Sequence, residues 1–246
     1  PMESLTGLIY RVNLNLMFER SYQFISADPV RMEPSELGWL VQRDATQAPG
    51  GTGAFRICKR LFDVVGCLCL LPVTALVALA LLALNAKHNP GPVFFRQQRM
   101  GHHCRAIWTI KFRTMQPNDQ ITRGPNDPLE THRITGLGQF LRRTRLDDLP
   151  QIINVLRGEM SLIGPRPDYF PHAHTYLLTV PEYRARHTIR PGISGLAQVD
   201  VGYVSGSLGT RSKAIRDLHY IENAGFWLEL YVIWRTLQII LSAAGR

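Results

Sequence analysis

The chain has 246 residues, of which 28 are lysine or arginine and 19 are aspartate or glutamate, so its formal net charge is +9. Hydrophobic residues make up 45% and the 16 prolines are not periodic, which excludes a collagen, a coiled coil and a wholly disordered chain. The positive excess indicates an anionic partner, whether nucleic acid, a phosphorylated small molecule or an acidic membrane surface.

Residues 1–55 have a mixed character and include a Gly- and Pro-rich stretch at 48–53. This stretch predicts a flexible connector between an N-terminal extension and the rest of the chain. Within the extension, the apolar positions between residues 5 and 16 fit a strand and a helix face equally well, so periodicity does not decide between them. We predict no function for residues 1–55.

A long apolar segment comes next. From Val64 to Leu84 the chain has 21 residues without a charged side chain. As a helix this segment extends about 32 Å, which is enough to cross the hydrocarbon core of a bilayer. The alternative is a buried core helix, for which the segment is long. We therefore predict a membrane helix within residues 56–88.

Two features predict that this helix leaves the membrane on the side where it entered. Pro72 removes a backbone donor and clashes with the carbonyl four residues earlier, which predicts a sharp kink near residues 68–72. Basic residues flank the segment on both sides, and the positive-inside bias keeps both flanks in the cytoplasm. The sequence therefore predicts a kinked, re-entrant helix that anchors a monotopic protein.

Residues 89–246 have the character of a small mixed α/β domain. A strand is predicted to start at Val93–Phe95, and alternating basic and apolar residues indicate half-buried strands at 95–101 and 111–115. Apolar residues recur at three- and four-residue steps over 226–241. That spacing fits an amphipathic helix at the membrane interface and a core-facing helix about equally well.

Charges of both signs gather just before another predicted helix. This helix runs from about 149 or 150 to 157, since Pro150 suits a first helical turn and Gly158 suits a stop. Three arginines, at 142, 143 and 145, precede the adjacent Asp147 and Asp148. An ionised carboxylate at a helix N-terminus could bind Mg²⁺ or attack phosphorus. It could also simply cap the helix among surface salt bridges, and this turn alone favours that alternative.

A further arginine has the setting of a phosphate ligand. Arg166 lies between Pro165 and Pro167, where the backbone is stiff and the guanidinium is presented with little entropy to lose. The strand segments at 95–101 and 111–115 add further basic side chains, although each alone is typical of a solvated strand face.

Together these segments resemble the bacterial sugar transferase family, the monotopic polyprenyl-phosphate hexose-1-phosphate transferases that begin surface glycan assembly. The resemblance runs from about Arg56 to Leu241 and comprises seven blocks in the family's order. The blocks are Lys59–Asp63, Gly91–Gln97, Lys111–Met115, Leu146–Gln151, Asn154–Ser161, Gly164–Pro167 and Arg190–Val199.

The resemblance implies transfer of a sugar 1-phosphate from a UDP-sugar to undecaprenyl phosphate at the cytoplasmic face of the bacterial inner membrane, with Mg²⁺ as cofactor and release of UMP. A covalent aspartyl intermediate would separate the encounter with a soluble donor from the encounter with a lipid acceptor. The resemblance does not identify the sugar, and it leaves a homo-oligomer open.

The resemblance also implies residue roles. Asp147 occupies the position of the nucleophile and is the implied Mg²⁺ ligand, while Asp148, an orienting group, stands where the family usually has glutamate. Leu71 stands where the family commonly has a serine before Pro72. Substrate-binding roles are implied for Lys111, Arg113, Arg142, Arg166, Arg190 and Gln198, with Arg142 and Arg166 holding phosphates.

Two non-catalytic interpretations compete with the sugar transferase interpretation. The arginine excess also suits a membrane-anchored nucleic-acid-binding protein, which would need a basic patch free of carboxylates. A scaffold for polysaccharide export would need no reactive Asp147 at all. The clustering of arginines beside Asp147 and Asp148 favours a phosphate-and-metal site over a nucleic-acid surface.

Overall fold

The computed structural model describes residues 50–116, 124, 127, 130–180, 182–202 and 206–242. All of them belong to one compact unit that begins at Thr46, and the predictions for residues 1–49 lie outside them. With η for short 3-10 helices, the elements in chain order are α3 (Gly53–His88), β1 (Phe94–Met100), η1 (His102–Cys104), β2 (Ala106–Phe112), η2 (Thr131–Arg133), α4 (Gly136–Arg143), η3 (Leu146–Gln151), α5 (Ile152–Leu156), β3 (Ser161–Ile163), α6 (Phe170–Thr179), η4 (Tyr183–Thr188), β4 (Gly192–Ser194), α7 (Leu196–Asp200), α8 (Gly206–Glu222) and α9 (Phe226–Leu241).

α3 is the apolar helix that the sequence predicts. It begins after Thr52, whose Oγ1 accepts a hydrogen bond from the Phe55 amide at 3.3 Å. Only 17% of its most apolar stretch is buried, and side chains such as Leu76 are 68% exposed. By length and composition α3 could anchor the chain in a membrane, and its exposure does not fit a core helix.

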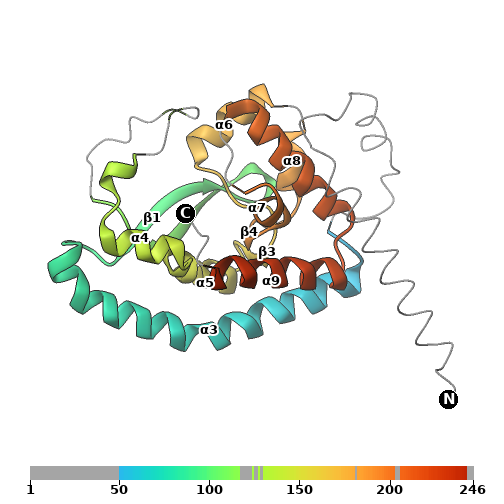
Figure 1. Ribbon diagram of the computed structural model, residues 1–246. Coiled ribbons are helices and arrows are strands. Elements are labelled where there is room, and N and C mark those ends of the chain that lie inside the picture. Colours follow the sequence, from blue (N-terminus) through green and yellow to red (C-terminus); the bar gives the residue numbers. More distant parts are fainter. Residues whose placement is uncertain are drawn as a thin grey trace, which may run out of the picture. The chain divides into compact units, whose positions relative to one another are not determined.

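The backbone stays helical through Pro72, and α3 follows a gradual bow along one side of the unit (Figure 1). The predicted sharp kink at residues 68–72 is therefore not observed. Thr74 Oγ1 donates to the Leu70 carbonyl at 2.9 Å, so a hydroxyl is supplied two residues after the proline although Leu71 has none. A proline and a back-bonded threonine each bend a helix, which accounts for a curve without a break.

The N-terminal half of α3 is fastened to the rest of the unit by polar contacts. Arg60 Nη1 and Nη2 donate to the carbonyls of Val155 and Leu156, at 2.7 and 3.1 Å, and so satisfy the last turn of α5. The buried Asp63 accepts from Ser161 Oγ at 2.8 Å at the start of β3. Arg60 and Asp63 of α3 thus hold α5 and β3 in place.

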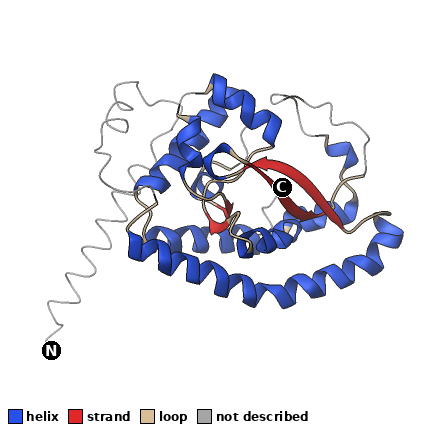
Figure 2. Cartoon of the chain, turned by 180° about the vertical axis from the view of Figure 1, so that it is seen from behind, coloured by secondary structure: helices blue, strands red, loops and turns tan. Residues whose placement is uncertain are grey.

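The C-terminal end of α3 joins the same unit. Asn89 caps the helix through its amide, which donates to the Asn85 carbonyl, and its side chain donates to the Arg113 carbonyl at 3.0 Å. Leu81 packs in the core cluster that holds Leu141. Both ends of the bowed helix are therefore held by one folded unit, as the view from behind also shows (Figure 2).

The two predicted strands form an antiparallel ribbon, β1 with β2. The first lies where the sequence places it, whereas the second begins at Ala106 and ends at Phe112 rather than spanning 111–115. The register pairs Phe95 with Lys111 and Arg99 with Ile107. Since directly paired residues point to the same face, Phe95, Arg99 and Lys111 share one face of the ribbon.

A second, smaller sheet pairs β3 with β4 in parallel. Its strands approach closely at glycines: a Cβ on Gly192 would lie 2.1 Å from the Gly164 amide nitrogen. This contact requires glycine, and it fixes the segment that leaves β3 and carries Arg166.

The predicted helix at 149–157 is present, but it begins earlier and is tighter. The 3-10 helix η3 starts at Leu146 and runs directly into α5, so Asp147 and Asp148 lie in its first turn. Arg145 precedes it in the left-handed region, with φ of 60°, and such strained positions cluster at functional sites. Gly158, with φ of 81°, follows the helix as predicted.

α9 confirms the predicted C-terminal helix, which has both a core-facing side and exposed apolar residues. Val232 is fully buried, while Trp227 and Trp234 are 57% and 59% exposed. On the inner side, the buried Glu229 accepts from Lys59 of α3 at 2.7 Å. α9 therefore runs beside the first half of α3 (Figure 1).

Two glycines of α4 test how this helix packs against Thr114. A Cβ on Gly138 would lie 2.0 Å from the Thr114 carbonyl oxygen, whereas a Cβ on Gly136 would meet nothing within 4 Å. We expect Gly138→Ala to lower the free energy of unfolding by about 3 kcal/mol. Gly136→Ala, the matched control, should change it by less than about 1 kcal/mol. Thermal denaturation of both variants in detergent measures this, and equal melting temperatures would contradict the packing of α4 on Thr114.

Candidate active site

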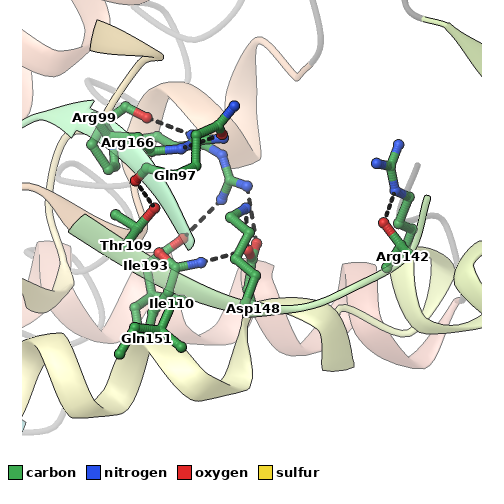
Figure 3. A network of polar contacts seen from close by, with 12 residues as sticks. Gln97, Arg99, Thr109, Ile110, Arg142, Asp148, Gln151, Arg166 and Ile193 are labelled. Carbon is green, nitrogen blue, oxygen red and sulfur yellow. Dashed lines mark hydrogen bonds and ion pairs between the residues drawn. The ribbon is translucent and has the colours of Figure 1, made fainter. Parts of the chain in front are cut away.

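Asp148 is the most firmly held carboxylate of the predicted site. It is 4% exposed, and its Oδ1 accepts from Lys111 Nζ and from Gln151 Nε2, each at 2.5 Å. Its Oδ2 accepts from Arg166 Nη2 at 2.9 Å. Figure 3 shows the Arg166 and Gln151 side chains converging on Asp148. Three elements, β2, η3 and the segment after β3, therefore meet at one buried carboxylate.

The charges explain why this carboxylate is tolerated inside the fold. Burial by itself raises the pKa of Asp148, but the Arg166 and Lys111 charges and hydrogen bonds outweigh it and hold the pKa well below its usual range. Asp148 is therefore ionised throughout the physiological range. Its oxygens are occupied, so it acts as an anchor for the two cations.

Asp147 has the opposite character although it is the adjacent residue. Within the described part of the chain, no hydrogen bond or ion pair holds its carboxylate, and it is only partly buried. Burial and the neighbouring Asp148 charge raise the pKa of Asp147, while Lys111, Arg166 and Arg142 act against that rise. A carboxylate with free oxygens amid cations can serve as a nucleophile or as a metal ligand.

Arg166 is placed by the loop between β3 and α6. Besides its bond to Asp148, its Nη1 donates to the Ile193 carbonyl at 3.2 Å. With its side-chain amide turned so that the oxygen faces the guanidinium, Gln198 accepts from the same nitrogen at 3.2 Å. The structure thus brings together Asp148, Lys111, Arg166 and Gln198, four of the predicted site residues.

Arg142 approaches the pair from another element. Its Nε donates to Thr114 Oγ1 at 2.9 Å, and Figure 3 shows its side chain well apart from the Arg166 group. Its charge opposes the rise in the pKa of Asp147 that burial and Asp148 cause. Asp147 therefore lies within electrostatic reach of two arginines, one on α4 and one on the loop after β3.

The other two predicted substrate ligands are placed differently. The buried Arg113 guanidinium donates to the backbone carbonyls of Asn89, Pro90 and Pro92, at 2.5 to 2.8 Å, so it fixes the turn between α3 and β1. Arg190 is exposed, and its charge helps to lower the pKa of His102. Within the described residues, the Arg113 guanidinium thus binds backbone carbonyls and neither aspartate.

Two side chains of the site have roles that the sequence did not predict. Gln151 binds Asp148 from one turn further along the helix, a spacing that follows from helical geometry once the helix starts at Leu146. Arg99 Nη1 donates to the Pro167 carbonyl at 2.6 Å. Arg99 belongs to a strand pattern that only indicates a basic face, so its partner could not be read from spacing.

The residues present could hold a magnesium ion only together with substrate phosphates and water. The described residues contain no group of three or more His, Cys, Asp or Glu side chains that could hold a metal. Mg²⁺, however, is commonly bound by one or two carboxylates together with substrate phosphates and water. The free oxygens of Asp147 satisfy that requirement, whereas those of Asp148 are already occupied.

A locked carboxylate lies beside a free one, within electrostatic reach of two arginines and in the same unit as an exposed apolar helix. This arrangement suits phosphate chemistry, and by length and composition the helix could anchor the chain in a membrane. The comparisons agree with this class. The bacterial sugar transferase family matches residues 54–243, and the chain belongs to that family.

Several curated relatives have related names. A UDP-N-acetylgalactosamine-undecaprenyl-phosphate N-acetylgalactosaminephosphotransferase of Aeromonas hydrophila is 37% identical over 78% of this chain and 45% of its own length. A UDP-glucose:undecaprenyl-phosphate glucose-1-phosphate transferase of Caulobacter vibrioides is 37% identical over 85% and 80%. An exopolysaccharide production protein of Rhizobium leguminosarum bv. phaseoli is 38% identical over 74% and 94%. The chain thus spans less than half of the first relative and most of the other two.

The Lys111–Asp148 pair predicts how activity depends on pH. Burial lowers the pKa of Lys111 to about 8, against the influence of Asp148. Below that value the ammonium is charged and the pair is intact; above it the lysine loses its proton while Asp148 stays ionised, so we expect turnover to fall. At the acid end, the raised pKa of Asp147 should bring its protonation, and a second loss of turnover, above the usual range for an aspartate.

Lys111→Arg tests whether deprotonation of Lys111 causes the alkaline loss of turnover, because a guanidinium stays charged to much higher pH. We expect the alkaline limb of the pH–rate profile to move upward in this variant while the acid limb stays in place. An unchanged alkaline limb in a folded Lys111→Arg protein would assign that limb to another group.

Proposed function

We propose that this protein transfers a sugar 1-phosphate from a UDP-sugar to undecaprenyl phosphate, releases UMP and so begins the assembly of a surface glycan. The observation that carries the proposal is the asymmetry of the aspartate pair: Asp148 is locked by three donors and Asp147 has free oxygens. The names of the relatives, which couple nucleotide sugars to undecaprenyl phosphate, support the same reaction.

The chemistry proceeds in two displacements. The Asp147 carboxylate attacks the phosphorus that bears the sugar, the bond from that phosphorus to the bridging oxygen breaks, and its electron pair leaves with UMP. A phosphate oxygen of the lipid then attacks the same phosphorus, and the bond to Asp147 breaks to restore the carboxylate. No proton transfer is required in either displacement.

Cations supply most of the assistance that this route needs. Negative charge on the transferring group is best offset by preorganised donors, and the charges of Arg166 and Arg142 both act on Asp147. Lys111 is committed to Asp148 and keeps that carboxylate from repelling the donor. Mg²⁺, when bound by Asp147 and the substrate phosphates, would neutralise further charge.

The position of α3 supports a monotopic arrangement on the cytoplasmic face of the inner membrane. One folded unit contacts both ends of the helix, through Arg60 and Asp63 at one end and Asn89 at the other. A straight span would place those ends on opposite sides of a bilayer, which one unit cannot reach. The exposed apolar side chains of α3 and α9 supply the surface that enters the lipid.

The readings without catalysis have weaker support. A nucleic-acid surface needs exposed, unpaired cations, whereas Arg166 and Lys111 are engaged with a buried carboxylate. A scaffold would have no use for a free carboxylate held beside a locked one. Neither reading explains why three elements converge on Asp148.

Turnover tests the proposal. We expect purified protein, mixed with Mg²⁺, undecaprenyl phosphate and a panel of UDP-sugars, to release UMP with one or a few donors. Asp147→Asn should reduce that release by at least about 1,000-fold, since a neutral amide is a poor nucleophile. Glu222→Gln, which alters an exposed carboxylate at the end of α8, is the matched control and should keep full activity. Full activity of Asp147→Asn would overturn the proposed role.

Cysteine labelling tests the membrane arrangement. Arg56 and His88 are exposed residues near the two ends of α3, so single cysteines at these positions in a Cys-free background should both react with an impermeant reagent from the cytoplasmic side only. Labelling from opposite sides would show that the helix spans the membrane and would contradict the monotopic proposal.

A further inference from the structure

The segment Pro165–Asp168, which carries Arg166, is held along its whole backbone. The Gly192 amide donates to the Pro165 carbonyl at 2.9 Å, and Arg186 Nη2 donates to the Arg166 carbonyl at 2.9 Å. Arg99 donates to the Pro167 carbonyl, as described above, and the Met100 amide donates to that of Asp168 at 3.0 Å. All four successive carbonyls of the segment therefore have a donor.

Arg186, one of these donors, is buried, at 2% exposure. It forms ion pairs with Asp168 through Nη1 and with Asp217 of α8 through Nη2, the latter at 2.7 Å. Tyr183 Oη also donates to Asp168, at 2.7 Å, and the guanidinium lies 5.1 Å from the centre of the Tyr183 ring. One planar cation thus joins η4, α8 and the segment that carries Arg166.

The ion pairs of Arg186 fix the position of the backbone at Arg166 more than they add to the stability of the fold. Ion pairs that replace water inside a protein repay their desolvation only when the geometry is good, and removing one partner strands the others. The fork of a guanidinium can reach two carboxylates and a carbonyl at once, which a lysine ammonium on a flexible stem cannot do. Asp168 and Asp217 therefore fix where the Arg166 carbonyl must lie.

The prolines transmit that position to the Arg166 side chain. Pro165 and Pro167 restrict the backbone on both sides of Arg166, so a shift of its carbonyl cannot be absorbed by rotation at these neighbours. The Arg166 guanidinium, whose Nη2 lies 2.9 Å from Asp148 Oδ2, is the part of the segment that contacts the aspartate pair. Small displacements of a phosphate-holding group reduce catalysis strongly.

We propose that Arg186 is a positioning residue for the transfer reaction: held by Asp168 and Asp217, it sets the place of the Pro165–Asp168 backbone and thereby of the Arg166 guanidinium. Arg186 touches neither substrate nor the aspartate pair in this scheme, and it acts only through Arg166. The inference rests on the proposed function for its kinetic consequence, while its structural part stands independently.

A double-mutant cycle tests the kinetic part. Arg186→Lys keeps a positive charge between Asp168 and Asp217 but loses the fork, so we expect kcat to fall about 10- to 100-fold with little change in the KM for the UDP-sugar. Arg166→Ala alone should also lower turnover. If Arg186 acts through Arg166, adding Arg186→Lys to Arg166→Ala should lower it no further. Arg184→Lys, an exposed neighbour in η4, is the matched control and should behave as the unmodified protein.

Hydrogen exchange tests the structural part without any substrate. The Met100 and Gly192 amides donate to carbonyls of the held segment, so their exchange should accelerate in Arg186→Lys, and less so in Tyr183→Phe, which removes only the phenol bond to Asp168. The Gly138 amide, bonded to Thr135 Oγ1, should be unaffected. If Arg186→Lys is too unstable to purify, Tyr183→Phe carries both measurements.

Two results would overturn the proposal: unchanged exchange at Met100 and Gly192 in both variants, or costs of Arg186→Lys and Arg166→Ala that multiply fully in the double variant. Failure of the unmodified protein to release UMP from any UDP-sugar would count against the proposed function instead, and exchange would still decide whether Arg186 places the segment.

Discussion

The ion pairs of Asp148 with Lys111 and Arg166 are the constraint on which the site depends. A buried carboxylate must be compensated, and here the two cations come from β2 and from the loop after β3. Each element is correctly placed only when the other is. The same pairs leave Asp147 as the carboxylate with free oxygens, so a requirement of folding also selects which aspartate can react.

The surrounding structure serves this convergence. Arg60 of α3 satisfies the end of α5, and Asp63 of α3 holds the start of β3, so the apolar helix fixes two elements that carry site residues. Glu229 of α9 pairs with Lys59 of α3 and accepts a hydrogen bond from Tyr220 of α8. The parts with exposed apolar surface are thus also the parts that support the site, which ties the proposed membrane contact to the geometry of the proposed active site.

The sequence predicts the pieces of this site better than their connections. The apolar helix, the first strand, the C-terminal helix and the Asp147–Asp148 turn follow from periodicity, charge and caps. The sharp kink predicted at Pro72 is wrong, because the effect of one missing backbone hydrogen bond is spread along a long helix as a gradual curve. Arg113 lies in a basic strand pattern that is typical of a site arginine, yet its guanidinium binds three backbone carbonyls. The turn after α3 supplies these carbonyls, and its path cannot be predicted from the pattern. The role of Gln151 depends on the exact residue at which η3 begins. The role of Arg186 depends on Asp168 and Asp217, which are distant in the sequence. Residue spacing alone predicts neither.

The central claim is that Asp147, and not Asp148, forms a covalent link to the sugar phosphate. The most direct measurement is mass spectrometry of peptides from protein incubated with a productive UDP-sugar and Mg²⁺ in the absence of lipid acceptor. The account predicts UMP release in proportion to enzyme and a hexose phosphate located on Asp147, absent from Asp147→Asn and formed more slowly in Asp148→Asn. An adduct on Asp148, an adduct that persists in Asp147→Asn, or UMP release only after undecaprenyl phosphate is added would contradict it.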